Sequence, residues 1–263
     1  MNAANRVFYL CLAMLGGTYV ALIVAMLAAD VFFTSPGELI GALASREIRY
    51  AIWLSLISCT VSTLAAMWVS VPLGYLLART DFPGKAAVDT LLDVPIVLPP
   101  LVVGLSLLIL FQTPLGQFVQ QFQTVTFAVP AVILAQFSVS AAFAVRTMRV
   151  TFEQMSPRTE QVARTLGCSR HQAFWRVVLP EARPGLLTAA TLAWARALGE
   201  FGPILIFAGT TRMRTEVLPT TVFLEMSIGK IAAAIAVSLL MIVVAAVVLV
   251  LARTFGLRGT GLI

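Results

Sequence analysis

Charged residues are scarce in this sequence. Only 11% of its 263 residues are Asp, Glu, Lys or Arg, whereas 59% are hydrophobic. A soluble domain carries about a quarter charged residues. The apolar residues here also come in runs of the roughly 20 residues that a helix needs to cross a bilayer. The composition therefore excludes a soluble globular protein and predicts an all-α integral membrane protein with several spans.

Groups that carry catalysis or bind metals are also few. The chain has one histidine, His171, and three cysteines, Cys11, Cys59 and Cys168, whose spacing fits neither metal ligands nor a disulfide framework. It has no glycine-rich phosphate-binding loop that ends in Lys-Ser or Lys-Thr. We therefore expect no catalytic residue, no metal site and no cofactor in this chain, and an intramembrane enzyme is disfavoured.

The net charge of +6 does not indicate a nucleic-acid partner, because the basic residues cluster at the ends of hydrophobic runs. That placement is how membrane proteins set their orientation. The first apolar run, of about 23 residues, is too long for the 7–15 apolar residues of a signal peptide. It is therefore expected to be the first span of a single transmembrane domain over residues 1–263.

Hydropathy predicts six transmembrane helices, because backbone amides in lipid must be satisfied within the segment. They are expected near Val7–Ala29, Ala51–Leu77, Leu91–Phe111, Thr126–Val145, Leu186–Ala208 and Ile231–Ala252. With the N-terminus inside, twelve of the 18 Lys and Arg residues lie on the cytoplasmic side and five outside. We therefore expect a multi-pass protein of the cell membrane with both termini, and the long fourth connection, in the cytoplasm.

The third predicted span contains residues that interrupt helices. Pro95, Pro99 and Pro100 lie in it with Gly104, and Pro114 follows at its exit. Broken backbone at membrane depth is tolerated where it packs against protein or lines a cavity. The span is expected either to line a pathway or to be a kinked packing helix.

The fourth connection, at about residues 153–184, is the most polar part of the chain. It is expected to form a short helix, a turn at Gly167 and a second amphipathic helix closed by Leu179-Pro180. Thr159 is expected to cap the first helix, with Glu160 in its first turn, and Ser169 the second. Residues Val162, Ala163 and Leu166 are expected to form one apolar patch.

Such a helix pair can lie on the bilayer surface or insert into a groove on a partner. The small residues Ala163 and Gly167 allow close backbone approach, which favours a partner.

The loop resembles the coupling loop of ATP-binding-cassette importer permeases. That family's motif is Glu-Ala-Ala, three residues, Gly, nine residues, an aliphatic residue, one residue and Leu-Pro. Five residues fall on this spacing: Ala163, Gly167, Val177, Leu179 and Pro180. Gln161 and Val162 stand where the family usually has Glu and Ala, although Glu160 precedes them.

The resemblance implies that the loop docks into a cleft on a cytoplasmic ATPase subunit, which binds ATP and Mg. The docking residues it implies are Glu160, Gln161, Ala163, Leu166, Gly167, Val177, Leu179 and Pro180. ATP would then be hydrolysed by that other chain.

From about Tyr50 onward the chain is similar to the permeases for molybdate, tungstate and sulfate. The likeness lies in Leu77–Gly84, Pro95–Gly104 and Arg196–Gly209. The stretch Arg-Ala-Leu-Gly-Glu-Phe-Gly that begins at Arg196 is most similar to molybdate permeases. After Gly209 the sequence departs from the family apart from an Arg-Thr and a Leu-Pro.

Two opposite charges fall inside the fifth predicted span. Arg196 and Glu200 are four residues apart and so share a helix face. Because isolated charges in lipid are costly, they should pair or face water. They are either a structural ion pair, or Arg196 also adds positive potential along an anion path. Gly199 and Gly202-Pro203 would loosen the helix, which suits a gate. Asp93 is expected to be solvated or paired.

Together these features predict the permease subunit of an ATP-driven importer for an oxyanion, with molybdate or tungstate as the expected cargo. A sulfate or thiosulfate permease is the alternative. An ion-coupled secondary transporter would need membrane-embedded acids, and only Glu200 qualifies.

The resemblance implies four kinds of partner: a second copy of the chain, two ATPase subunits, an external oxyanion-binding protein and the lipid bilayer. Alternating access would use the third and fifth spans. The pathway or gate candidates are Pro99, Pro100, Gly104, Arg196, Gly199, Glu200 and Gly202.

Overall fold

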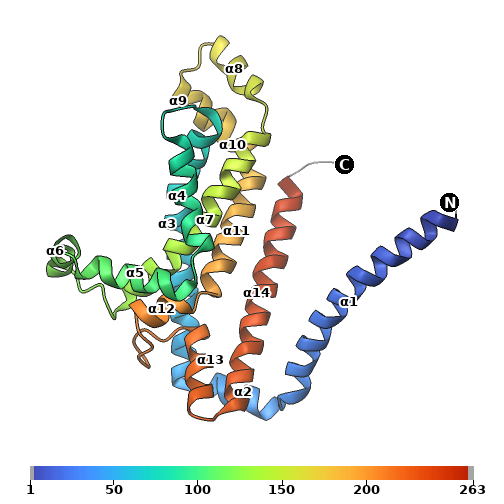
Figure 1. Ribbon diagram of the computed structural model, residues 1–263, viewed down its shortest axis with the longest axis vertical. Helices are drawn as coiled ribbons and strands as arrows, with labels where there is room; N and C mark the ends of the chain where they lie inside the picture. The colour runs from blue at the N-terminus through green and yellow to red at the C-terminus, as the bar shows by residue number, and fades with distance from the viewer. Residues whose placement is uncertain (1–2, 260–263) are drawn as a thin grey trace.

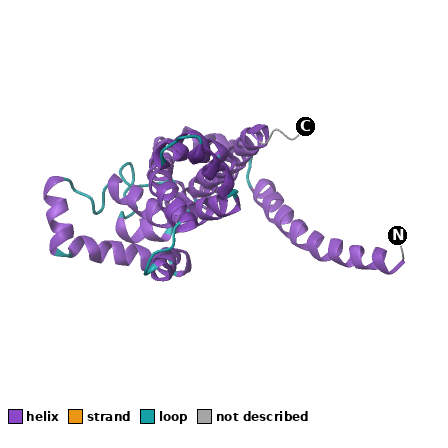
Figure 2. Cartoon of the chain, turned by 90° about the horizontal axis from the view of Figure 1, so that it is seen from above, coloured by secondary structure: helices purple, strands orange, loops and turns teal. Residues whose placement is uncertain are grey.

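The computed structural model describes residues 3–259, which form helices and loops with no strand among them (Figure 2). Residues 1–2 and 260–263 lie outside the described residues. The prediction that both termini are cytoplasmic therefore falls on residues that the structure does not describe. The helices run mostly along one long axis, and α1 diverges from the others (Figure 1).

Four helices are long and apolar enough to cross a membrane. They are α1 (Ala3–Phe33), α3 (Arg46–Arg79), α7 (Val129–Gln154) and α14 (Ile231–Gly259). These helices cover the first, second, fourth and sixth predicted spans, because each is an uninterrupted apolar run. Pro72 lies inside α3 without ending it.

The third predicted span is divided in two. Helix α4 (Lys85–Val97) and helix α5 (Pro100–Gln112) are bent by 113° at the break, and together they count as a fifth candidate span. Pro99 has extended backbone, and neither it nor Pro100 has an N–H for a continuous helix. Helix α5 therefore lies across the bundle and leads to α6 (Pro114–Phe122) at its far end (Figure 1).

The fifth predicted span is also broken. Helix α11 (Arg183–Leu198) has 16 residues, and α12 (Gly202–Phe207) follows after a gap at Gly199. The structure thus has four continuous candidate spans, or five with the bent pair, where six were predicted. The expected loosening around Gly199 and Gly202-Pro203 is confirmed, and it ends the helix before it reaches the length of a span.

Small residues let the central helices approach closely. Ala66 of α3, Ala144 of α7 and Ala193 of α11 have no exposed surface and form one cluster. Such residues are typical of helix contacts in membranes. A side-chain bond adds to this contact, since Ser62 Oγ donates to the carbonyl of Ile133 at 2.9 Å.

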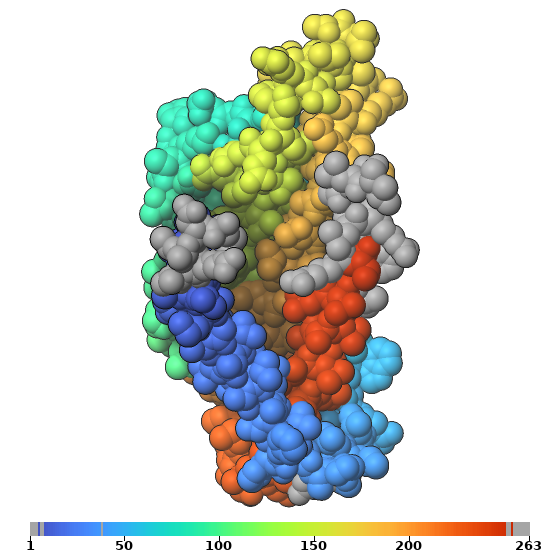
Figure 3. Space-filling view, turned by 90° about the vertical axis from the view of Figure 1, so that its right-hand side faces the viewer, coloured from blue at the N-terminus to red at the C-terminus, as the bar shows by residue number. Residues whose placement is uncertain are grey.

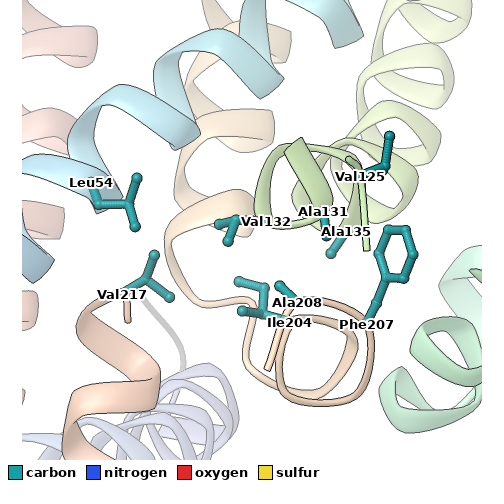
Figure 4. Packing of buried hydrophobic residues seen from close by; sticks show 9 residues of the cluster. All are labelled: Leu54, Val125, Ala131, Val132, Ala135, Ile204, Phe207, Ala208 and Val217. Atoms are coloured by element: carbon teal, nitrogen blue, oxygen red, sulfur yellow. The ribbon is translucent and has the colours of Figure 1, made fainter. Parts of the chain in front are cut away.

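A second apolar cluster joins α12 to the bundle. Ile204, Phe207 and Ala208 point toward Ala131 and Ala135 of α7 (Figure 4). The short helices α2 (Pro36–Ala44) and α13 (Leu218–Ser227) lie at the end of the bundle opposite α8 (Figure 1). This apolar cluster therefore packs the helices that follow the two breaks, α5 and α12, against α7.

Candidate functional site

The predicted coupling loop is an ordered helical segment, here called the polar segment, of residues 156–181. It contains α8 (Pro157–Thr165), α9 (Arg170–Ala173), the π-helix η1 (Phe174–Val178) and α10 (Leu179–Glu181). Figures 1 and 3 show α8 and α9 at one end of the long axis, beyond the ends of the long helices. Helices α8 and α9 therefore project past the long helices, while Glu160 and Phe174 keep the polar segment in contact with α3.

Two of the predicted local signals in the polar segment are confirmed. Gly167 has a φ of 92°, a left-handed conformation that suits glycine, and it follows the end of α8. Ser169 caps α9 in a reciprocal capping box with Gln172. The cap predicted at Thr159 is wrong, because Ser156 occupies that position and its hydroxyl accepts from the amide of Arg158.

The predicted helix end at Pro180 is also wrong. The helix passes through η1, where the amide of Leu179 donates to the carbonyl of Phe174, and continues to Glu181. Pro180 lies inside this continuous helical stretch, just after the π-helix. π-Turns are rare and are often found at functional sites.

The exposed apolar surface of the polar segment differs from the predicted patch. Val162 is 56% exposed and Leu166 80%, but Ala163 is only 8% exposed and faces the chain itself. Trp175, which the sequence did not single out, is 55% exposed. Trp175 follows the half-buried Phe174 in η1, whose π-helical conformation has no clear signal in the sequence.

The other predicted docking residues are placed as follows. Gln161 and Gly167 are exposed, whereas Glu160, Val177, Leu179 and Pro180 are half-buried. The structure therefore brings three large apolar side chains, Val162, Leu166 and Trp175, to the outside of a segment that is otherwise polar.

The two helix breaks meet at a glycine-mediated crossing of α5 and α12. A Cβ added at Gly104 would lie 2.7 Å from the Cα of Pro203, and one added at Gly202 would lie 2.9 Å from the Cβ of Pro100. Pro99 caps α5 at the same break. Of the predicted gate candidates, Pro100, Gly104 and Gly202 are thus brought together, and a Cβ at either glycine would force its neighbours to shift.

The expected pairing of Arg196 with Glu200 is confirmed. Arg196 Nη1 lies 2.7 Å from Glu200 Oε2, an ion-pair contact without hydrogen-bond geometry. Glu200 is 1% exposed, and the guanidinium of Arg196 also lies 5.8 Å from the centre of the Phe143 ring. Gly199 is exposed at the end of α11. The pair keeps a buried carboxylate compensated at the helix break.

Asp93 is paired as expected, with its Oδ1 2.8 Å from Arg146 Nη1. Among the described residues, no three His, Cys, Asp or Glu side chains lie together so that they could hold a metal ion.

The chain matches known membrane transport proteins in sequence and in fold. Residues 70–257 match the family model of the binding-protein-dependent transport system inner membrane component. A molybdate/tungstate transport system permease protein of Thermococcus kodakarensis is 38% identical over 195 residues, 73% of this chain and 75% of that protein. A sulfate transport system permease protein of Salmonella typhimurium is 34% identical over 183 residues, 68% of this chain and 66% of that protein.

A solved structure shares the fold. The structure of a bacterial ABC transporter that imports the acidic polysaccharide alginate gives a TM-score of 0.76 at 20% identity, with 97% of each chain covered. The region that matches the family model, residues 70–257, includes the polar segment and both helix breaks. The chain therefore belongs to the binding-protein-dependent transport system inner membrane components, the multi-pass permeases of ATP-binding-cassette importers.

Proposed function

We propose that this chain is the membrane permease of an ATP-driven importer for a tetrahedral oxyanion, with molybdate or tungstate as the cargo. Two copies would form the pathway, an external binding protein would deliver the anion, and a separate ATPase would bind ATP and Mg. The polar segment would dock on that ATPase in the cytoplasm. The exposed apolar surface of the polar segment is the observation that carries this proposal.

The position of the polar segment supports docking over binding to lipid. An amphipathic helix on a bilayer would lie level with the ends of the spans. Instead, α8 and α9 extend beyond those ends (Figure 3). Val162, Leu166 and Trp175 lie exposed there. Large apolar side chains that water would otherwise surround are typical of a protein interface.

The choice of cargo rests on similarity. The molybdate/tungstate relative from Thermococcus kodakarensis is somewhat more similar to this chain than the sulfate relative from Salmonella typhimurium. The stretch that begins at Arg196 also resembles molybdate permeases. A sulfate permease is the second candidate, and uptake of labelled molybdate in competition with tungstate and with sulfate separates the two.

The test of docking is the substitution Leu166→Glu. It places a charge on an 80%-exposed side chain that supports no packing of the chain itself. Burial of an unpaired charge in the interface should weaken binding of the ATPase subunit by about 3 kcal/mol or more, roughly a hundredfold. Pull-down of the purified ATPase with the detergent-solubilised permease measures this.

Gln154→Glu is the matched control, because Gln154 is exposed at the end of α7 and lies outside the polar segment. It should leave ATPase binding unchanged. Undiminished ATPase binding by the Leu166→Glu permease would show that the polar segment is not the docking element. Substitution of Ala163 is a poor test, because a larger side chain there would clash within the chain.

A further inference from the structure

Tyr75 is one of the residues through which the polar segment contacts the bundle. It lies near the end of α3, and its hydroxyl donates to Glu160 Oε1 of α8 at 2.8 Å. Its ring packs edge-on against Phe152 of α7, with centroids 5.5 Å apart, and against Phe174 of η1, with centroids 4.8 Å apart. One side chain of α3 therefore contacts three other elements at once.

The hydrogen bond to Glu160 differs in kind from the ring contacts. The rings belong to a buried cluster that includes Met148 and Val178, so they hold the fold together. The hydroxyl instead reaches α8, which makes no other side-chain hydrogen bond to the bundle among the described residues. Because the acceptor is a carboxylate, the bond is of the stronger, charge-assisted kind.

The surroundings of Glu160 are electropositive. Tyr75 and Glu160 line a 210 Å³ cavity together with Arg79, Arg164 and Arg170. These three basic side chains place positive charge around the carboxylate that accepts from Tyr75. Arg79 also donates to the carbonyl of Met155 at 2.9 Å, which holds the chain just before α8.

Helix α3 connects this point with the opposite end of the bundle. Next to Tyr75, a Cβ on Gly74 would lie 2.8 Å from the Cβ of Met148, so the backbones of α3 and α7 are in direct contact. The helix has 34 residues and is therefore roughly 50 Å long. Near its other end, Ser55 Oγ accepts from the amide of Leu218, the first residue of α13, at 2.8 Å.

We propose that Tyr75 is a positioning residue that couples the polar segment to α3, so that movement of α8 reaches the opposite end of the bundle through this helix. The proposal rests on the proposed function, in which an ATPase moves the polar segment. The coupling contact is the hydrogen bond from the hydroxyl of Tyr75 to the carboxylate of Glu160, while the ring of Tyr75 stabilises the fold.

The substitution Tyr75→Phe separates these two parts, because it removes the hydroxyl and keeps the ring. In proteoliposomes with the ATPase and the external binding protein, ATP hydrolysis should continue. The number of oxyanions imported per ATP hydrolysed should fall roughly tenfold, the size expected from loss of one hydrogen bond to a charged group. A purely structural role would lower ATP hydrolysis and import together and leave their ratio unchanged.

Two further variants make the test specific. In the Glu160→Ala background, Tyr75→Phe should cause no further loss of the ratio, because the bond is already absent. Tyr19→Phe is the matched control, since Tyr19 is 67% exposed on α1. An unchanged ratio in Tyr75→Phe, or an additive loss in the double variant, would overturn the proposal.

A measurement on the permease alone distinguishes this proposal from the proposed function. Amide hydrogen exchange in α8 should be about tenfold faster in Tyr75→Phe than in the unchanged chain, with exchange in α3 and α7 unaltered. Equal exchange in α8 would overturn the proposal whatever the ATPase does. If exchange changes as expected but the unchanged permease binds no ATPase, the proposed function is wrong and with it the coupling role.

Discussion

At the scale of single residues, Gly104 is the point of closest approach between α5 and α12. Gly104→Ala would place a Cβ 2.7 Å from the Cα of Pro203 and 3.0 Å from its carbonyl oxygen. Because both atoms belong to the backbone, they cannot move aside by a rotamer change. We expect the variant to lose about 1–3 kcal/mol of stability, visible as a lower melting temperature in detergent.

Gly17→Ala is the control for this prediction, because a Cβ at Gly17 on α1 meets nothing within 4 Å. Its melting temperature should equal or exceed that of the unchanged protein. Equal melting temperatures for Gly104→Ala and Gly17→Ala would mean that the two helix breaks are not in the contact described here.

Glu216 gives a prediction that depends on pH. It lies in the loop between α12 and α13 and is fully buried. Burial raises its pKa above the ordinary value of 4.5, against the lowering influence of Thr221 and of the charge on Arg212. The folded protein therefore keeps this proton at pH values where the unfolded chain has lost it, so the free energy of unfolding falls as the pH rises above 4.5.

Glu216→Gln removes this contribution. The melting temperature of the variant, relative to the unchanged protein, should rise between pH 4 and pH 7.5. Glu181→Gln, which removes a carboxylate from an exposed position, serves as the control. A difference between Glu216→Gln and the unchanged protein that stays constant over this range would show that burial does not raise the pKa of Glu216.

The sequence predicted residues whose role is local. The turn at Gly167 and the cap at Ser169 follow from backbone preferences that act within a few residues. The exposed Trp175 and the buried Ala163 could not be predicted, because burial depends on how the polar segment packs against the rest of the chain. The pairing of Arg196 with Glu200 was predictable from the cost of an isolated charge in lipid and their spacing of four residues, although Glu200 lies just beyond the end of α11.

At the scale of elements, ion pairs hold α4 against α7. Arg149 contacts both Asp89 and Glu153, and Arg146 lies 2.8 Å from Asp93. These side chains are between a quarter and two thirds exposed, so each pair should contribute at most about 1 kcal/mol. Their role is therefore the placement of α4, which precedes the 113° bend.

The double substitution Asp89→Asn and Asp93→Asn should release α4 with little loss of overall stability. Amide exchange in α4 should become about tenfold faster, because two weak pairs are lost together. Asp81→Asn, whose ion pair with Lys85 does not reach α7, is the control. Unaltered exchange in α4 of the double variant would show that apolar packing alone places this helix.

Elements were predictable where hydropathy alone decides them. The spans over α1, α3, α7 and α14 are long apolar runs without a breaking group, and Pro72 was tolerated because tertiary contacts hold α3. The prolines of the third span predicted that its helix is interrupted. They did not predict the angle between α4 and α5. After the bend, α5 packs against α12 through Gly104 and Pro203, residues about a hundred positions apart, a contact that the pattern of the third span alone does not contain.

At the scale of the whole molecule, the chain presents apolar surface that it does not cover itself. The apolar stretch of α1 has none of its residues buried, and α5 extends outward from the bundle (Figure 2). These surfaces require lipid or a second copy. Family membership follows from motifs spread over the chain, whereas the position of α1, whose apolar stretch is unburied, is not predictable from those motifs.

The central claim is that transport by this permease is driven by a separate ATPase. The most direct test is uptake of labelled molybdate by proteoliposomes that contain the permease and its ATPase subunit, with the external binding protein outside. We predict uptake only when ATP is enclosed with the ATPase, and its loss in the Leu166→Glu variant. Uptake driven by a proton or sodium gradient in vesicles that lack the ATPase would contradict the account.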